Sequence, residues 1–159
     1  MYRIGMGYDA HCLAAGRPLI LGGVTLPHAT GLEGWSDADV LTHAVADAVL
    51  GAAAMGDIGQ HFPPGDPAFK NASSLDLLAR VAQLIGDLGY TVVNIDTVLI
   101  LEAPRIGPYR DEMAGNIAAA LGIEGGQVAV KATTTEGMGF TGRGEGAAAQ
   151  AVALLRKSE

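Results

Sequence analysis

An acidic residue and two histidines in the first third of the chain could share a metal ion. Asp9 and His11 are two residues apart, so in extended backbone both side chains point to the same face. His43 would add a third ligand and complete a set of one carboxylate and two imidazoles, with a fourth position open to a substrate. The pattern predicts a metal site, and an ordinary strand end with a half-buried structural histidine is the alternative interpretation.

Other polar residues could support such chemistry. Asp39 and Asp47 lie one helical turn on either side of His43 and could orient its ring, or could form a solvated helix face. The run 133–136 (TTTE) precedes a Gly-rich loop, where backbone amides and hydroxyls can approach an anion and Glu136 can offer a carboxylate to Mg²⁺. Plain β-propensity explains the threonines equally well. Arg105 offers a guanidinium for a phosphate.

Helices and loops must hold these residues in place. Apolar residues at helical spacing predict a helix from Ser36 to about residue 54, with Ser36 and Asp39 as a start resembling a capping box. A second helix is predicted from Ser73 or Ser74 to a stop at Gly89. Residues 56–69 contain three prolines and three glycines without a usable period, which indicates a functional loop.

Strands and two further helices complete the predicted fold. The N-terminal part predicts short strands, with a hairpin in 18–26 around two glycines. Later segments predict a strand over 91–101 with Val93, Ile95, Leu99 and Leu101 on its core face, a helix from Pro108 to Leu121, a strand over 127–133 and an Ala-rich helix ending at Leu155. We therefore expect one α/β (α+β) domain over residues 1–159, with a four-stranded mixed sheet packed against helices.

Composition disfavours several classes of protein. With 159 residues, 49% of them apolar, the chain can bury one sizeable core. No apolar run is long enough for a spanning helix, and the N-terminus does not resemble a secretion signal. The formal net charge of −7 argues against nucleic-acid binding, and the single cysteine fits a reducing compartment. We expect a cytoplasmic enzyme without nucleic-acid or membrane partners.

Several long motifs, taken in order and spacing, carry a family resemblance. They are GYDAH, GWSDADVLTHAVADAVLGAAAMGDIG, FPPGDPAFK, EAPRIGPY and KATTTEGMGFTGRGEG. In this combination the chain resembles the 2-C-methyl-D-erythritol 2,4-cyclodiphosphate synthases, and the resemblance runs essentially end to end. Composition and spacing alone would not have named a substrate.

The resemblance implies a reaction and an assembly. Members of this family are homotrimers, with sheets around the threefold axis and active sites between subunits. They are phosphorus–oxygen lyases of the non-mevalonate route to isoprenoid precursors. The implied substrate is 4-diphosphocytidyl-2-C-methyl-D-erythritol 2-phosphate, whose 2-phosphate attacks the β-phosphorus, closes the cyclic diphosphate and expels CMP.

The resemblance also implies roles for residues. Asp9, His11 and His43 are implied ligands of Zn²⁺, one ion per site, and Glu136 a ligand of a second divalent cation, Mg²⁺ or Mn²⁺. Thr134 and Trp35 are implied catalytic positions. The implied substrate contacts are Asp9, Ala10, His11, Trp35, Ser36, Asp57, Ile58, Gly59, Phe62, Pro63, Pro64, Gly65, Asp66, Leu101, Glu102, Ala103, Pro104, Arg105, Ile106, Gly107, Thr133, Thr134, Thr135, Glu136, Phe140 and Arg143.

The chain departs from the family pattern at a few positions. Trp35 stands where histidine is common, and Glu102 and Arg105 replace the commoner Gln and Lys. Some relatives bind an isoprenoid diphosphate on the trimer axis. This chain has Gln150 where a relative has Glu, so such a ligand is only a weak expectation here. Two other hypotheses stay open: a zinc hydrolase acting on a nucleotide diphosphate, and a non-catalytic trimer that binds nucleotide or isoprenoid diphosphate.

Overall fold

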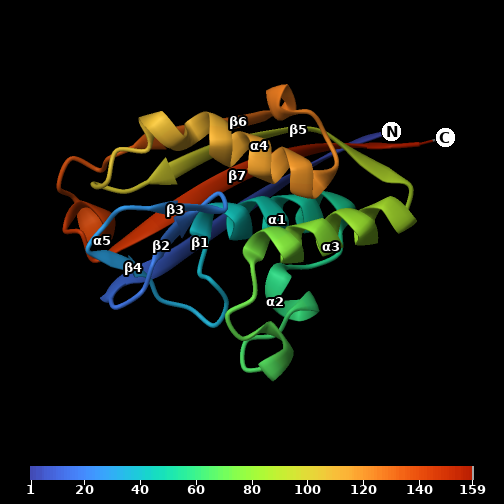
Figure 1. Ribbon diagram of the computed structural model, residues 1–159. Helices are drawn as coiled ribbons and strands as arrows, with labels where there is room; N and C mark the ends of the chain where they lie inside the picture. The colour runs from blue at the N-terminus through green and yellow to red at the C-terminus, as the bar shows by residue number, and fades with distance from the viewer. Residues whose placement is uncertain (159) are drawn as a thin grey trace.

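The computed structural model describes residues 1–158 and contains a mixed five-stranded sheet with helices on one face (Figure 1). The strands are β1 (Tyr2–Ala15), β2 (Leu19–Leu21), β3 (Val24–Leu26), β4 (Thr30–Leu32), β5 (Tyr90–Ile100), β6 (Val128–Thr133) and β7 (Gly146–Lys157). The helices are α1 (Val40–Ala53), α2 (Ile58–His61), α3 (Ser74–Asp87), α4 (Arg110–Leu121) and α5 (Gly139–Gly142), with 3₁₀ turns at Pro67–Phe69, Gly107–Tyr109 and Gly125–Gln127.

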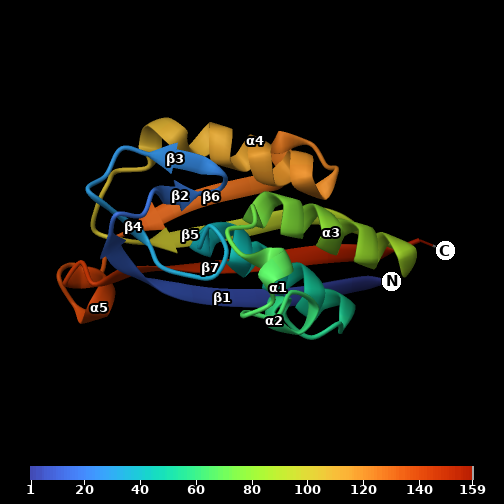
Figure 2. The ribbon, with the colours of Figure 1, turned by 60° about the horizontal axis from the view of Figure 1, so that its bottom comes forward.

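The main sheet has the order β4-β1-β7-β5-β6, and only β5 and β6 run parallel. The mixed α+β fold was therefore predicted correctly, but the sheet has five strands and not four. Strands β2 and β3 form the predicted hairpin as a separate two-stranded sheet. Figures 1 and 2 show α1, α3 and α4 grouped on one side of the long strands.

The largest error of the sequence prediction is the last element. The Ala-rich segment predicted as a helix is β7, the central strand, paired with β1 on one side and β5 on the other. Ala149, Ala151 and Ala153 are fully buried, or nearly so. Pairing on both edges satisfies the backbone along the whole segment, and this tertiary context overrides the helix propensity of alanine.

Small residues bring α1 very close to β1. A Cβ added at Gly5 or Gly7 would overlap the backbone of α1 at Ala48 and Ala44, so only glycine permits this approach. The alternate residues Arg3, Gly5, Gly7 and Asp9 of β1 face α1. The close contact therefore decides how near the Asp9 side chain comes to α1.

Helix α1 begins four residues later than predicted. Its N-cap is Asp39, whose side chain accepts a hydrogen bond from Thr42 N, and Ser36 does not cap the helix. The helix is almost entirely buried because the sheet lies on one side and α3 on the other. Helix α3 has Ser73 as N-cap and ends before Gly89 as predicted, and α4 follows a 3₁₀ turn at Pro108.

Two local predictions need correction. In β5 the core-facing residue is Val92 rather than Val93, because the pairing with β7 has a bulge between Val92 and Asn94 that resets the alternation. The segment 56–69, predicted as a loop, contains α2 and a 3₁₀ turn, each started by an aspartate, Asp57 and Asp66, that caps the backbone. Both elements are too short to give a periodic pattern.

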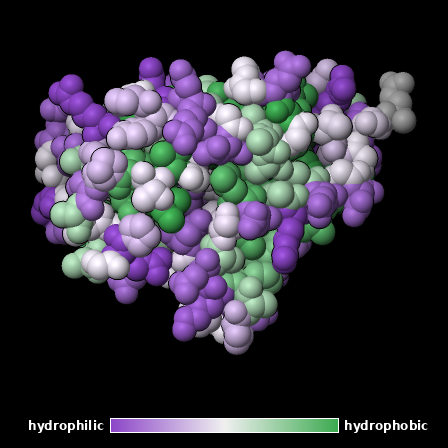
Figure 3. All heavy atoms as spheres, viewed as in Figure 1, coloured by the Kyte–Doolittle hydropathy of each residue, from purple (hydrophilic) through white to green (hydrophobic). Residues whose placement is uncertain are grey.

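The second face of the sheet carries no helix in the described chain, residues 1–158. Exposed apolar side chains line it: Tyr2, Ile4, Met6 and Tyr8 from β1 and Val152 from β7. The start of β1 and the end of β7 lie side by side at one end of the sheet (Figure 1). On the side viewed in Figure 3, patches of hydrophobic residues alternate with hydrophilic ones. Among residues 1–158, no helix has the length and hydrophobicity needed to cross a membrane.

Candidate metal and substrate site

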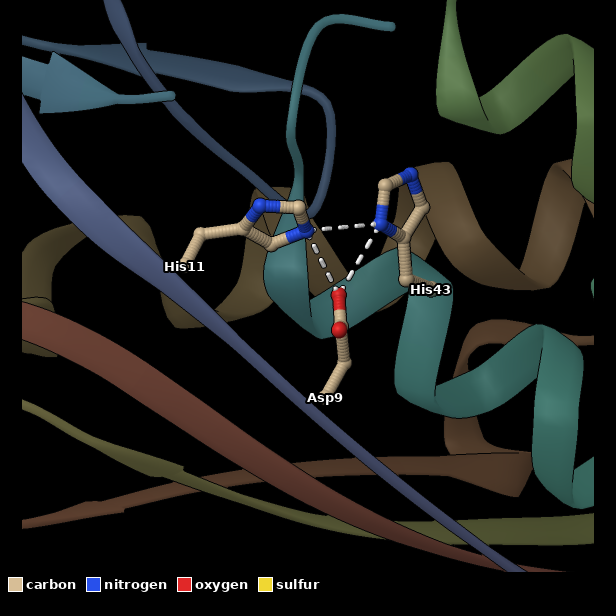
Figure 4. Close-up of side chains that lie close together, drawn as sticks. All are labelled: Asp9, His11 and His43. Atoms are coloured by element: carbon tan, nitrogen blue, oxygen red, sulfur yellow. Dashed lines mark hydrogen bonds and ion pairs between the residues drawn. The ribbon is translucent and has the colours of Figure 1, made fainter. Parts of the chain in front are cut away.

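Three side chains predicted as metal ligands converge at one point. Asp9 and His11 project from β1, and His43 projects from the first turns of α1 (Figure 4). The Asp9 Oδ2 atom lies 2.9 Å from His11 Nε2 and 2.9 Å from His43 Nδ1, and the two nitrogens are 3.2 Å apart. The three residues predicted as ligands, two from a strand and one from a helix, therefore lie close enough together to share one ion.

The donor set fits a divalent metal ion. Ligand atoms around a tetrahedral zinc ion lie about 3.3 Å apart, given metal–ligand distances near 2 Å. The three atoms here are already within 3.2 Å of one another, and together they could hold one ion. One carboxylate and two imidazoles leave a fourth position, and a cavity adjoins them, so the arrangement is an open site rather than a closed structural one.

Burial and neighbouring groups shift the pKa values of Asp9 and His11. Burial alone raises the pKa of Asp9, but hydrogen bonds from His11 and His43 outweigh it and hold that pKa well below its usual range. Burial also disfavours the charged form of His11 and so lowers its pKa, but the hydrogen bond to Asp9 outweighs this effect and the net shift of the pKa is upward. The other ring nitrogen of His11, Nδ1, lies 2.7 Å from the Glu33 carbonyl oxygen. A divalent cation would replace a proton here.

The residues that orient His43 differ from the predicted ones. Asp39 is buried at the N-cap of α1 and binds backbone amides, and Asp47 accepts a hydrogen bond from Ile58 N at 2.7 Å. Neither carboxylate has a hydrogen bond to the His43 ring. Instead, His43 Nε2 lies 2.8 Å from Ser74 Oγ and 3.1 Å from Ser36 Oγ. Ser74 is 31 residues away in sequence, and no local pattern could have linked it to His43.

A cavity of about 200 Å³ opens over the candidate metal ligands. The lining residues predicted from the family resemblance are Asp9, His11, Trp35, Ser36, His43, Ile58, Gly59, Phe62 and Pro64. Phe69 and Leu77 also line it and were not predicted. The Trp35 indole N–H donates to the Asp66 carbonyl at 2.8 Å, and Lys70 Nζ lies 5.8 Å from the ring centroid, so the indole anchors the loop beside the site.

A second and larger cavity, of about 600 Å³, lies where β5 and β6 end. Its predicted lining residues are Leu101, Glu102, Pro104, Arg105, Ile106, Gly107, Thr133 and Thr134. Arg110 also lines this cavity and was not predicted. The segment RIGPYR, which places a second guanidinium five residues after Arg105, was the signal in the sequence. The two cavities share no lining residue, so one chain divides the predicted substrate contacts between two places.

The remaining predicted site residues of the described chain line neither cavity. They are Ala10, Asp57, Pro63, Gly65, Asp66, Ala103, Thr135, Glu136, Phe140 and Arg143. Ala10 is exposed, and the alternation of β1 turns its side chain away from Asp9. Glu136 is outside the three-ligand cluster and accepts a 3.3 Å hydrogen bond from Thr134 Oγ1. Arg143 pairs with Glu145 at 2.7 Å on the surface.

Fold and site together define a class: an α+β protein with an open carboxylate and two-histidine site that could hold a divalent ion, beside a separate cavity with two arginines. The YgbB family profile matches residues 2–156, and the chain belongs to this family.

Named relatives agree with the assignment. The chain is 61% identical to the 2-C-methyl-D-erythritol 2,4-cyclodiphosphate synthase of Desulfatibacillum aliphaticivorans, over 96% of this chain and 99% of the relative. Among solved structures, it resembles the bifunctional IspDF of Campylobacter jejuni with a TM-score of 0.96 and 39% identity, covering 100% of this chain and 43% of that one. It also resembles a 2C-methyl-D-erythritol-2,4-cyclodiphosphate synthase in its CDP-bound form, with a TM-score of 0.88 and 33% identity, over 97% of this chain and 100% of that one.

Proposed function

We propose that this protein is a cyclising, CMP-releasing phosphorus–oxygen lyase: a 2-C-methyl-D-erythritol 2,4-cyclodiphosphate synthase of the non-mevalonate isoprenoid pathway. The observation that carries the proposal is the convergence of Asp9, His11 and His43 beside a cavity, in a chain 61% identical to a relative of that name. The substrate is 4-diphosphocytidyl-2-C-methyl-D-erythritol 2-phosphate. The CDP-bound neighbour supports a cytidine nucleotide as its leaving half.

Metal ions complete the proposed site. Asp9, His11 and His43 would hold Zn²⁺, one ion per site, and Glu136 would ligate a second divalent cation, Mg²⁺ or Mn²⁺. When bound, these ions supply Lewis acidity that neutralises the phosphate oxygens. The oxygen ligand at Glu136 suits the harder cation, which prefers carboxylates and phosphates.

The residues of the chain mainly hold the two reacting phosphates in place. An oxygen of the 2-phosphate bonds to the β-phosphorus, and the bond from that phosphorus to the CMP oxygen breaks, so the attacking group belongs to the substrate. Positioning is then the main contribution of the protein. Ser36 and Trp35 would bind phosphate near the metal, with Trp35 acting through its backbone. Thr134 would stabilise the transferring group, and Arg105 would pair with the nucleotide diphosphate.

Two features support a homotrimer with active sites between subunits. The bare sheet face carries Tyr2, Ile4, Met6 and Tyr8, each at least half exposed, which is a large apolar surface for a monomer to leave in water. The metal cavity and the arginine-containing cavity are separate within one chain. Association through the bare face would let one subunit supply the metal and its neighbour the nucleotide contacts. We place the enzyme in the cytoplasm.

The test is ³¹P NMR of the purified protein with the substrate, with and without a chelator. We expect coupled cyclic diphosphate signals together with CMP, and loss of both on chelation. The His43→Ala variant should lower turnover by several orders of magnitude. A linear hydrolysis product would instead identify a zinc hydrolase, and bound substrate without reaction would indicate a binding protein. Undiminished activity of His43→Ala in metal-free buffer would refute the assigned ligand set.

A further inference from the structure

A chain of hydrogen bonds runs from the side of His43 that faces away from the metal ligands into α3. His43 Nε2 lies 2.8 Å from Ser74 Oγ. The Ser74 hydroxyl donates in turn to Asp37 Oδ1, and Ser74 N donates to Asp37 Oδ2 at 2.9 Å. Ser74 is only 1% exposed, so its hydroxyl is shielded from water, whereas Asp37 is partly exposed. The chain links α1, the segment before it and the first residue of α3.

The chemistry of the three groups determines which of them donates and which accepts in each hydrogen bond. A carboxylate accepts hydrogen bonds and has no proton to donate, and a serine hydroxyl has a single proton. Because that proton goes to Asp37, the oxygen of Ser74 is left to accept, and the proton between Ser74 and His43 must come from Nε2. An imidazole that donates from Nε2 can offer the lone pair of Nδ1, and Nδ1 is the atom that faces Asp9 and His11.

Two carboxylates therefore act on opposite sides of one ring. Asp9 lies 2.9 Å from Nδ1 and attracts a proton to that nitrogen, whereas Asp37 acts through Ser74 to keep a proton on Nε2. Only the second arrangement leaves Nδ1 free for a metal ion. We propose that Asp37 and Ser74 are positioning residues for the metal site, which hold a proton on His43 Nε2 and keep Nδ1 available as a ligand. This inference rests on the proposed metal-dependent function.

The same arrangement frees the hydroxyl of Ser36. Ser36 Oγ lies 3.1 Å from His43 Nε2, accepts a hydrogen bond from Ala38 N at 3.2 Å and lines the metal cavity. If Nε2 lacked a proton, the Ser36 hydroxyl would donate to the ring. Because Nε2 carries the proton, the Ser36 hydroxyl can donate to a phosphate oxygen in the cavity instead. Loss of Ser74 should therefore raise KM as well as weaken metal binding.

Two variants test the hydrogen bonds between His43, Ser74 and Asp37: one removes them, and the other reverses their direction. Ser74→Ala removes the acceptor for His43. Asp37→Asn keeps the shape of the side chain, but an amide nitrogen in place of Oδ1 donates to Ser74 Oγ and no longer accepts from Asp39 N. The hydroxyl then turns to donate to Nε2 and drives the ring proton to Nδ1. Asp76→Asn is the matched control, because it makes the same charge change at an exposed position in the first turn of α3.

The primary measurement is Zn²⁺ affinity by chelator competition, with denaturant unfolding of each metal-free protein to confirm folding. Partners that orient a metal-bound histidine typically contribute 10- to 100-fold in affinity. We expect losses of about that size for Ser74→Ala and larger ones for Asp37→Asn, with Asp76→Asn unchanged. In the zinc-loaded wild type, the His43 Nε2–H proton should resonate downfield and exchange slowly, and Ser74→Ala should abolish both properties.

The possible outcomes separate this inference from the proposed function. Wild-type zinc binding with unchanged affinity in both variants would overturn the role of Asp37 and Ser74 alone. A wild type that binds no zinc would overturn both proposals. If Ser74→Ala fails to fold, Asp37→Asn still decides the question, because it retains an oxygen to accept from Ser74 N. Wild-type affinity in Asp37→Asn would then refute the inference.

Discussion

Replacing Asp39 tests how the start of α1, and with it His43, is fixed. The Asp39 carboxylate is fully buried and accepts four hydrogen bonds: from Thr42 N at 3.0 Å, Thr42 Oγ1 at 2.7 Å, Gly22 N at 3.0 Å and Gly23 N at 2.8 Å. It is therefore both the N-cap of α1 and the anchor of the β2–β3 hairpin. The Asp39→Ala variant should lose both contributions at once.

The expected loss follows from these contacts. Removing an N-cap costs about 1 kcal/mol, and leaving the buried Gly22 amide without an acceptor adds about 1–3 kcal/mol. Gly23 is exposed, so its amide can bond to water, and the Thr42 hydroxyl can turn to a helix carbonyl. The total is about 2–4 kcal/mol, a large part of the roughly 5–15 kcal/mol typical of folded domains.

Urea denaturation at one fixed protein concentration measures this loss, because a trimer would make the midpoint depend on concentration. Asp39→Asn is the matched control. It keeps the shape, one acceptor oxygen and the helix cap, but its amide nitrogen cannot accept from Gly23 N, so its loss should be smaller than that of Asp39→Ala without vanishing. A loss below about 1 kcal/mol in Asp39→Ala would refute the assignment of Asp39 as a double anchor. Equal losses in the two variants would refute the hydrogen-bond argument.

Further predictions concern packing, the second cation and pH. Gly7→Ala should destabilise the protein by about 3 kcal/mol or more in urea denaturation, because its Cβ overlaps the Ala44 carbonyl, whereas Gly115→Ala, with open space around it in α4, should be neutral or stabilising. Glu136→Gln should raise the Mg²⁺ concentration needed for activity at unchanged zinc content, and loss of zinc by elemental analysis would contradict this assignment. The pKa of His11 is higher in the folded metal-free protein than its unfolded value of 6.5. The stabilisation from this shift is complete below pH 6.5, and the free energy of unfolding should fall as the pH rises through the folded pKa. Zinc affinity should rise over the same pH range, and chelator competition titrations at several pH values would measure it.

Much of the candidate site could be predicted from local pattern. Asp9 and His11 share a face because strand side chains alternate, and His43 falls near the start of a helix that the apolar spacing indicated. The helix over residues 74–87 and the hairpin around Gly22 and Gly23 also followed from capping and turn residues. These predictions succeed because their causes lie within a few residues of each other.

The partners of these groups could not be predicted in the same way. Asp39 and Asp47 were expected to orient His43 from one turn away, but their carboxylates bind backbone amides, at 3.0 Å to Thr42 N and 2.7 Å to Ile58 N. Ser74 takes that place from the start of another helix. A hydrogen bond across 31 residues depends on how α1 and α3 pack, and helical periodicity does not specify that packing.

The sequence by itself determined which chemistry this protein could attempt and which residue types would perform it, because ligand identity and short spacing are local properties. The tertiary structure alone decided that the Ala-rich C-terminal segment is the central strand β7, since its backbone pairs with β1 and β5, which lie far away in the chain. It also decided that α1 approaches β1 closely at Gly5 and Gly7, so that the candidate ligand atoms of Asp9, His11 and His43 lie within 3.2 Å of one another. Both results come from contacts between distant segments, and their free energy outweighs local propensity.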